Sequence, residues 1–383
     1  MNVCDSSMII FMKQFFITHS AILQPNYAQG KRLGGEEIQE VLNQAEKDEY
    51  FHFEKNFLQL PCNIPKSIDI SFGSHLTNVL SSITSYQTCS NIDLVINETT
   101  IAVNRHDYVN IYHTLTDLYT VYLLCRFFQR DPKSVRILFL DAHPKGNLDI
   151  YWTQLFHSFS RLGHMKNYKS MFYKELIWSQ PQAQSEIDVQ RHRSKTPSFF
   201  EDFRAHMLEQ FHIDSRTNQT INCQSLQVFF LGRRNYVAHP RNPTGKITRQ
   251  LQNEKEILEN LQRKFSQYSQ INFTYNYFEQ LSIEEQLKTI VKTDVYIGMH
   301  GAGLTYVMLL KPYRALVELA SSSWESQDHF ELMASMNHVY YHRCRIHDSS
   351  STLTETIFNC AKKKILQLCP SVMNLSAINS QIH

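Results

Sequence analysis

A glycine-rich segment, GMHGAGLT at 298–305, has the composition of a turn that binds phosphate. It lies between a predicted strand at 294–298 and a predicted helix at 304–310. Open α/β sheets bind ligands at the carboxyl ends of their strands, and a helix N-terminus presents free N–H groups to an anion. The segment is therefore the first candidate for a ligand site.

Within it, Gly301 and Gly303 would let the backbone approach a phosphate, with Ala302 between them, and His300 could donate to a phosphate oxygen. The order G-x-x-G-x-G differs from the dinucleotide fingerprint G-x-G-x-x-G, which disfavours a nicotinamide-dependent oxidoreductase. The alternative is a tight turn whose glycines only permit the helix to pack on the strand.

Two arginines, Arg233 and Arg234, follow a short apolar run at 226–231 that reads as a buried parallel strand. Guanidinium groups at a strand end can neutralise a leaving diphosphate by bidentate contacts, and we expect Arg234 to do so. An exposed basic loop is the alternative.

Three further residues extend this candidate site. Asn253 and Glu254 open a helix predicted at 254–265, and Glu318 ends an otherwise apolar strand. A carboxylate at position 318 would suit acceptance of two ribose hydroxyls, whereas the alternative is a capping or salt-bridged glutamate.

A histidine and an aspartate, His113 and Asp117, are four residues apart in a helix predicted at 108–127 and so share one face. Such a pair can act as a general base with its orienting partner, and either residue could be the base. An amphipathic helix with an incidental polar pair is the alternative. Asp141 and His143, which close a predicted strand at 135–141, are the next candidates.

No D-x-D triplet occurs in the chain. The carboxylate pair that usually holds a divalent ion in metal-dependent sugar transferases is therefore missing. We expect no metal and no cofactor, so that arginine, histidine and helix N-termini would meet the charge of a leaving group.

Alternating strand and helix patterns after residue 226 predict a doubly wound parallel sheet, and the chain as a whole is predicted to be α/β. With 383 residues it exceeds one ordinary core. We expect an N-terminal domain at 1–222, a Rossmann-like domain at 223–345 and a helical tail at 346–383, with a cleft between the two domains. The polar stretch 180–196 is predicted to be a loop.

Composition is that of a globular protein, and a formal net charge of +2 without a basic run argues against nucleic acid as a partner. Four N-x-S/T sequons favour the secretory pathway; they begin at Asn97, Asn218, Asn272 and Asn374. The apolar stretch 8–17 is about half the ~20 residues of a membrane span, and no signal anchor is evident.

These segments together resemble glycosyltransferase family 61. The most specific block is TDVYIGMHGAGLTYVMLL at 293–310, and N-x-x-H-T-x-T-D matches 110–117. The plant members that add β1,2-linked xylose to N-glycans share R-x-x-Y-x-A-H-P-R, here RRNYVAHPR at 233–241, which adds His239 and Arg241 as cleft candidates. The family's transferases of O-linked N-acetylglucosamine to EGF domains share the first block.

The resemblance implies a GT-B architecture of two Rossmann-like domains and an inverting, metal-independent transfer from a UDP-sugar to a glycoprotein. Xylose is the expected sugar, and N-acetylglucosamine transfer to EGF-like domains is the alternative. A non-catalytic α/β binding paralogue is the competing class. The implied location is the lumen of the secretory pathway, the Golgi in preference to the endoplasmic reticulum.

Overall fold

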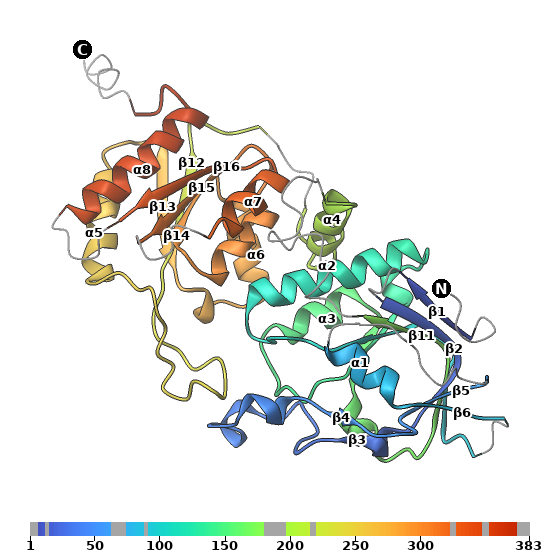
Figure 1. The fold of residues 1–383 in the computed structure, drawn as a ribbon. Coiled ribbons are helices and arrows are strands. Elements are labelled where there is room, and N and C mark those ends of the chain that lie inside the picture. The colour runs from blue at the N-terminus through green and yellow to red at the C-terminus, as the bar shows by residue number, and fades with distance from the viewer. Residues whose placement is uncertain are drawn as a thin grey trace, which may run out of the picture. The chain divides into compact units, whose positions relative to one another are not determined.

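The computed structural model describes residues 7–11, 15–62, 74–87, 91–179, 197–214, 220–321, 327–346 and 352–373. Contacts divide the chain into two compact units, each drawn in Figure 1. Unit 1 comprises Met1–Asp188 with Val237–Thr244, and unit 2 comprises Val189–Tyr236 with Gly245–His383. The division therefore falls at 188 instead of the expected 222, inside the predicted loop 180–196, which lies outside the described residues.

Unit 2 is built on a five-stranded, all-parallel sheet in the order β13-β12-β14-β15-β16. The sheet confirms the doubly wound half that the alternating pattern predicts. Its strands are β12 (Leu226–Leu231), β13 (Ile271–Asn276), β14 (Val295–Met299), β15 (Ala315–Ala320) and β16 (Tyr340–Arg345).

Helices cover both faces of this sheet (Figure 1). On one face, α5 (Glu254–Phe265) and α8 (Leu353–Leu368) pack on the sheet through one continuous apolar core. On the other lie α6 (Ile283–Lys292), α7 (His329–Met336) and the 3₁₀ helix η8 (Ala302–Leu309). Because α8 belongs to this core, the segment from 346 is part of unit 2 and not a separate tail.

Local sequence signals explain the helices of unit 2. The apolar residues of α5 recur at the helical period, and all four are buried: Ile257, Leu258, Leu261 and Phe265. In α6 the predicted capping box is present, because Ser282 accepts from the backbone of Glu285 while the Glu285 carboxylate accepts from Ser282. The helix expected at 304–310 is a 3₁₀ helix at Ala302–Leu309. The remaining elements are α4 (Phe200–Gln210) and η7 (Phe278–Gln280).

Unit 1 contains a nine-stranded mixed sheet whose main path is β10-β9-β8-β11-β2-β5-β6. The strands β8, β9, β10 and β11 run parallel, whereas β2 is antiparallel to both β11 and β5. The strands are β1 (Met8–Phe11), β2 (Phe15–Leu23), β5 (Leu58–Leu60), β6 (Ile83–Ser85), β7 (Leu94–Ile96), β8 (Thr100–Val103), β9 (Arg136–Phe139), β10 (Ser158–Arg161) and β11 (Met171–Ser179).

The apolar stretch at 8–17 forms β1 and the start of β2, which pair antiparallel. It is apolar because β2 lies inside the sheet between β11 and β5. Across the described part of the chain, no helix has the length and hydropathy needed to cross a membrane.

In Figure 1, α2 (Ile111–Phe127) and α3 (Asp149–Leu155) lie on one side of the unit 1 sheet, and α1 (Ser74–Ser81) lies on the other with the ladder of β3 (Ala28–Gln29) and β4 (His52–Phe53). The helix α2 begins at 111 and not at the predicted 108, because the Asn110 side chain accepts from Tyr112 N and caps it. Short 3₁₀ helices complete the unit at Pro25–Tyr27, Ile38–Glu40, Glu46–Glu49, Pro132–Ser134 and Leu162–Met165.

Two disulfides link α8 to other segments of unit 2. Cys223–Cys369 joins the end of α8 to the residues before β12, and Cys344–Cys360 joins β16 to the middle of α8, with Cα–Cα distances of 5.6 and 5.9 Å. Structural disulfides form and persist in oxidising compartments.

Candidate functional site

The carboxyl edge of the unit 2 sheet brings together most of the predicted donor-site residues. Arg233 follows β12, His300 and Gly301 follow β14, and Glu318 lies in β15, which pairs with β14 in parallel. Adjacent parallel strands end at the same edge of a sheet, so residues far apart in the chain become neighbours there.

The guanidinium of Arg233 lies against Gly301. A Cβ placed on Gly301 would stand 2.0 Å from Arg233 Nη1, so only glycine leaves room for this contact. Arg233 Nε donates to the backbone oxygen of Thr248 at 2.8 Å, which fixes the plane of the guanidinium. Burial, and next the charge of Arg249, lower the pKa of Arg233. A glycine turn thus holds a partly desolvated cation against it, which suits a diphosphate.

Arg234, the residue that we expected to hold the diphosphate, has other partners. Its Nε contacts the Glu279 carboxylate at 2.5 Å, and its guanidinium lies 4.8 Å from the centroid of the Tyr277 ring. The side chain is well exposed. The geometry therefore favours Arg233 as the diphosphate ligand, because the charge of Arg234 is already neutralised by a carboxylate.

Glu254 supports the arginine turn from the first residue of α5. Its carboxylate accepts from the backbone N–H of Arg233 at 3.1 and 3.2 Å. Burial raises the pKa of Glu254, although hydrogen bonds from Tyr277 and from the Arg233 backbone oppose the shift. Asn253 is exposed with φ at 54°, and its side chain makes no capping hydrogen bond. Glu254 therefore positions Arg233.

Glu318 is fully buried in a network around His300. The carboxylate accepts from His300 Nδ1 and from the Tyr341 hydroxyl, and its Oε2 lies 3.6 Å from Arg343 Nε. His300 Nε2 lies 3.0 Å from the amide oxygen of Gln327. In this structure the Glu318 carboxylate accepts from His300 and Tyr341, and the expectation that it receives ribose hydroxyls stays a prediction. The salt-bridged alternative applies, and Glu318 orients His300.

The other two members of the turn have packing roles. A Cβ on Gly303 would approach Leu231 Cδ2 to 2.5 Å, so this glycine permits η8 to pack on β12. Ala302 begins η8 and is half-buried. For Gly303 the packing alternative thus accounts for the glycine without a ligand.

The side chains of His113 and Asp117 in α2 do not form the pair that the sequence predicts. His113 is half-buried, and burial lowers its pKa to about 4. Asp117 is fully buried, its Oδ1 makes no hydrogen bond, and burial raises its pKa well above the ordinary value. Among the described residues, no hydrogen bond or ion pair joins the two side chains. Burial leaves Asp117 no route to an acceptor hydroxyl, so His113 is the better placed of the two.

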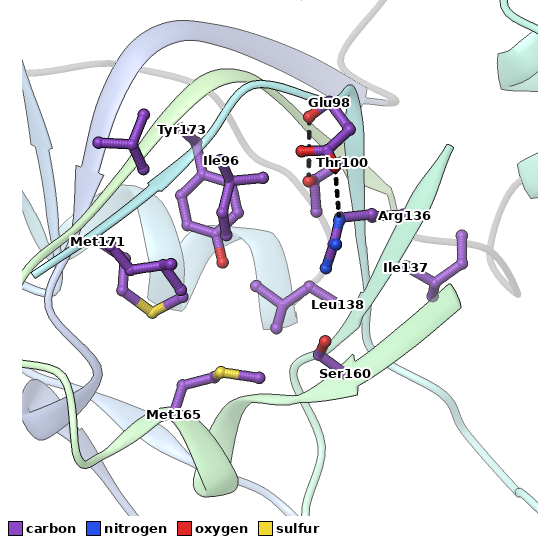
Figure 2. Close-up of a pocket in the computed structure, with 12 residues that line it drawn as sticks. Ile96, Glu98, Thr100, Arg136, Ile137, Leu138, Ser160, Met165, Met171 and Tyr173 are labelled. Atoms are coloured by element: carbon purple, nitrogen blue, oxygen red, sulfur yellow. Dashed lines mark hydrogen bonds and ion pairs between the residues drawn. The ribbon is translucent and has the colours of Figure 1, made fainter. Parts of the chain in front are cut away.

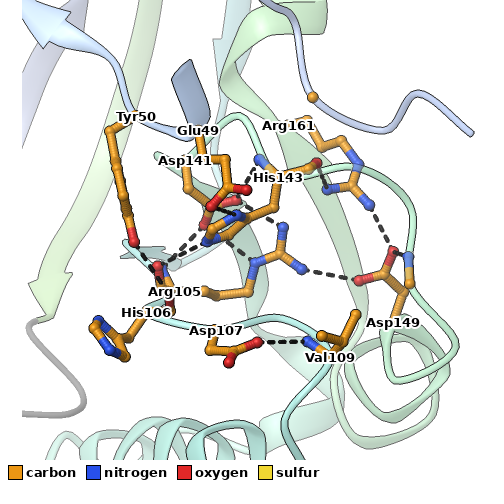
Figure 3. Close-up of polar contacts among 12 residues, drawn as sticks. Glu49, Tyr50, Arg105, His106, Asp107, Val109, Asp141, His143, Asp149 and Arg161 are labelled. Carbon is orange, nitrogen blue, oxygen red and sulfur yellow. Dashed lines mark hydrogen bonds and ion pairs between the residues drawn. The ribbon is translucent and has the colours of Figure 1, made fainter. Parts of the chain in front are cut away.

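Asp141 and His143 belong to a buried ion-pair network, shown in Figure 3. Asp141 contacts Arg105 at 2.7 Å, and Arg105 and Arg161 contact Asp149 at 2.9 and 2.6 Å. Burial alone would raise the pKa of Asp141, but the Arg105 charge holds it well below its ordinary value. The network neutralises its own charges, so it stabilises the loops after β8 and β9 and leaves no exposed base.

His239 and Arg241 lie in unit 1, although they follow the arginine turn in the chain. His239 Nε2 is 3.7 Å and Arg241 Nε is 3.8 Å from the buried carboxylate of Glu49, and Arg241 Nη1 is 2.9 Å from Glu46. Burial, opposed by Glu49, lowers the pKa of His239. The A-H-P-R segment is thus anchored on an acidic pair from the 3₁₀ helix at Glu46–Glu49.

A separate cavity of about 160 Å³ opens on the unit 1 sheet, and Figure 2 shows its apolar wall with the Arg136–Glu98 ion pair above it. None of the predicted site residues lines it. Within the described residues, no three side chains of histidine, cysteine, aspartate or glutamate are arranged to hold a metal ion. Metal independence remains a prediction, since a donor diphosphate could itself carry an ion.

A family model, Glycosyltransferase 61, matches residues 50–317. The chain belongs to glycosyltransferase family 61. The family match confirms the resemblance drawn from the three motif blocks at 110–117, 233–241 and 293–310, and the protein is therefore a glycosyltransferase.

One similar protein is a β-1,2-xylosyltransferase of rice (Oryza sativa subsp. japonica). It is 26% identical, and the match covers 88% of this chain and 71% of the rice protein. The β-1,2-xylosyltransferase of Arabidopsis thaliana is 26% identical, and the match covers 68% of this chain and 54% of the Arabidopsis protein. The EGF domain-specific O-linked N-acetylglucosamine transferase of Rattus norvegicus is 24% identical, and the match covers 65% of this chain and 45% of the rat protein. The chain thus spans about half the length of the last two.

Among solved structures, Escherichia coli ADP-heptose lipopolysaccharide heptosyltransferase II is 8% identical, with a TM-score of 0.39, covering 70% of this chain and 99% of that one. The α/β class of this family 61 chain rests on its own sheets, the parallel one in unit 2 above all.

Several residues of the site carry no signal in the sequence. Glu49 lies in an acidic run that reads as a solvated face, and Tyr341 and Arg343 lie in a strand of mixed polarity. Arg249 is an isolated basic residue in a polar loop. Only contacts between distant segments reveal them.

Proposed function

We propose that this family 61 enzyme transfers xylose from UDP-xylose, with inversion and without a metal ion, to a hydroxyl of a glycoprotein glycan. The contact of Arg233 with Gly301 carries the donor half of the proposal, because it places a guanidinium at a glycine turn on the carboxyl edge of a parallel sheet. The names of the rice and Arabidopsis relatives support xylose as the sugar.

In the proposed reaction the acceptor oxygen attacks the anomeric carbon of xylose as the bond to the diphosphate oxygen breaks. UDP leaves with the electron pair of that bond, and the acceptor proton passes to a base. We assign the base to His113, which is half-buried at the start of α2 and neutral near pH 7 because burial lowers its pKa to about 4. Arg233 and the η8 N-terminus would meet the charge of UDP.

The disulfides of α8 support an oxidising compartment, and we propose the lumen of the Golgi. The nucleotide sugar and a glycoprotein acceptor are then the partners. The names of the EGF domain-specific relatives favour a second candidate, transfer of N-acetylglucosamine to EGF-like domains.

The test is a donor panel with purified full-length protein. Hydrolysis of UDP-xylose, UDP-N-acetylglucosamine and UDP-glucose is measured with and without EDTA, followed by transfer to an N-glycan glycopeptide and to an EGF-like domain. We expect turnover of UDP-xylose that survives EDTA, and a β-linked product. Preference for UDP-N-acetylglucosamine would favour the second candidate. A loss of turnover on chelation that manganese restores would refute metal independence.

A further inference from the structure

Two of the four sequons lie within the described residues, and their surroundings differ. Asn97 begins the sequon N-E-T in unit 1, and Asn272 begins N-F-T in unit 2. The sequons at Asn218 and Asn374 begin outside the described residues. A glycan is bulky and hydrated, so a sequon suits modification where the folded chain leaves its asparagine at the surface and out of regular pairing. The local structure therefore separates the two described sequons.

Asn97 lies in a bulge of the unit 1 sheet. The strands β7 and β8 follow one another along β11, and both run parallel to it. Three residues, 97–99, separate β7 from β8, whereas only two, 174–175, separate the segments of β11 that pair with them. An extra residue on one strand is left out of the ladder, and the chain bulges there. The asparagine of this sequon is thus outside the regular pairing of the sheet.

The Asn97 side chain points to solvent. Asn97 is exposed, and so is Val95 two positions earlier, at 54%. Residues 94–96 and Glu98 line the cavity of Figure 2, whereas Asn97 does not. Among the described residues, the side-chain amide of Asn97 makes no hydrogen bond. Its nitrogen therefore has room to carry a substituent.

Asn272 is exposed as well, but its side chain belongs to a ladder. It lies in β13, where it pairs with Gln227 of β12 in an uninterrupted register. Its Nδ2, the atom to which a sugar would be bonded, donates to Gln227 Oε1 at 2.7 Å. A glycan on this nitrogen would have to displace that contact and stand against the neighbouring strand. The same three-residue motif is thus open at one site and engaged at the other.

The threonine of the Asn97 sequon indicates when the site is available. Thr99 Oγ1 donates to Glu175 Oε1 at 2.6 Å and accepts from Arg130 Nε at 3.2 Å. The motif requires this hydroxyl, and Glu175 lies 76 residues further along the chain. Because β11 carries Glu175, the hydroxyl stays unengaged by it until β11 has been synthesised and has paired. Modification of Asn97 would therefore precede the closing of the unit 1 sheet.

We propose that Asn97 carries an N-linked glycan and that Asn272 does not. The inference rests on the proposed lumenal location, where an oligosaccharide linked to a lipid through a diphosphate is the donor. The amide nitrogen of Asn97 forms a bond to the anomeric carbon of the first sugar as the bond from that carbon to the diphosphate oxygen breaks. The lipid diphosphate leaves with the electron pair of that bond, and one amide proton passes to a base of the host's transferase.

The experiment uses the full chain, secreted from a eukaryotic host behind a cleavable leader so that it enters the lumen. Peptide N-glycosidase in heavy-oxygen water converts a glycosylated asparagine to labelled aspartate, which peptide mass spectrometry detects at each position. We expect the label at Asn97 and none at Asn272. Asn97→Gln should remove one glycan, and Thr99→Ser should keep it. The matched control is Asn26→Gln, which changes an exposed asparagine of unit 1 outside any sequon and should leave the glycans as in wild type.

Two results would overturn the inference. One is an unlabelled Asn97 in the secreted wild-type chain, whether or not other sequons are labelled, because the leader brings every sequon to the donor. The other is label at Asn272 as abundant as that at Asn97, because pairing in a ladder would then give no protection. Both are measured on the wild-type chain, so neither depends on whether a variant folds.

The inference and the proposed function fail separately. Asn97 precedes β8, at the end of the parallel strands opposite to Asp141 and His143, which follow β9. Asn97→Gln should therefore turn over UDP-xylose as wild type does. Protein that is labelled at Asn97 but turns over no UDP-sugar would retain the glycan site and refute the proposed function. Protein that turns over UDP-xylose while Asn97 is unlabelled would retain the function and refute the inference.

Discussion

Arg233 and Gly301 are in direct contact, with Arg233 Nη1 2.0 Å from the position that a Cβ on residue 301 would occupy. The two residues are 68 positions apart and meet because β12 and β14 are parallel neighbours. Gly301 has φ at 168°, an extended conformation open to any residue, so the glycine is required for space and not for backbone freedom.

Arg233→Ala should reduce kcat/KM about 10²–10³-fold, or ~2.7–4 kcal/mol, because it removes a preformed group that would stabilise the leaving diphosphate. Arg234→Ala should have a much smaller effect, since the charge of Arg234 is already paired with Glu279. Steady-state kinetics with UDP-xylose measure both. Gly301→Ala should resemble Arg233→Ala, as its methyl group displaces the guanidinium. A larger loss for Arg234→Ala than for Arg233→Ala would reverse this assignment.

Glu318→Gln should destabilise the protein by about 1–3 kcal/mol, because it weakens hydrogen bonds to a buried charged group. The amide also cannot accept from His300 and Tyr341 as the carboxylate does, so the UDP affinity should fall too. Urea unfolding and UDP calorimetry provide the measurements. Glu256→Gln, on the exposed face of α5, is the matched control. Unchanged stability of Glu318→Gln would show that the network adds nothing to the fold.

His113→Asn should lower kcat about 10²–10⁴-fold with little change in UDP affinity if His113 is the base. His52→Asn changes an exposed histidine of the same unit and is the control. In wild type, kcat/KM should stay flat down to about pH 5 and fall as His113 becomes protonated, since its pKa is lowered to about 4. A near wild-type rate for His113→Asn would make His239 the next candidate, the only other partly exposed histidine of the predicted set.

Asp117→Asn should leave activity nearly unchanged and alter how stability depends on pH. Burial raises the pKa of Asp117 in the folded state, so the folded protein keeps a proton that the unfolded chain releases. The stabilising contribution of the Asp117 carboxyl to the free energy of unfolding is therefore fully present below the pKa that it has in the unfolded chain. It is lost as the pH rises towards the pKa that it has in the folded protein. Between about pH 5 and pH 8 the variant should lose less stability than wild type, as urea unfolding at several pH values would reveal. A stability difference that is constant across this range would contradict the buried, protonated carboxyl.

Replacing both cysteines of a disulfide by serine should destabilise unit 2. The bridge Cys223–Cys369 spans 146 residues and Cys344–Cys360 spans 16. By the loop-entropy model the shorter bridge contributes about 3 kcal/mol and the longer one nearer 5 kcal/mol. Denaturant unfolding of the two double variants tests the order. Equal losses of stability in the two double variants would indicate that residual structure in the unfolded chain, and not loop length, sets the contribution of each disulfide.

Much of unit 2 could be predicted from the sequence because its signals are local. The helix α5 begins and ends where its apolar period indicates, at Glu254 and Phe265, and Ser282 with Glu285 marks the start of α6. Unit 1 was harder to predict, since β2 is a buried strand whose antiparallel partners lie far away in the chain. Its apolar run therefore carries no signal that distinguishes a strand from part of a longer apolar segment.

The sequence by itself determined the family 61 motifs, the parallel strands of unit 2 and the placing of a glycine turn and an arginine pair at strand ends. Only the tertiary structure decided that Arg233 faces the turn while Arg234 faces Glu279, and that Asp117 is enclosed. Spacing along a chain records which residues follow a strand. The direction of each side chain, and the charge that it meets, depend on strands and loops brought close by packing. For two adjacent arginines, that difference separates the proposed ligand of the donor, Arg233, from Arg234 in a surface ion pair.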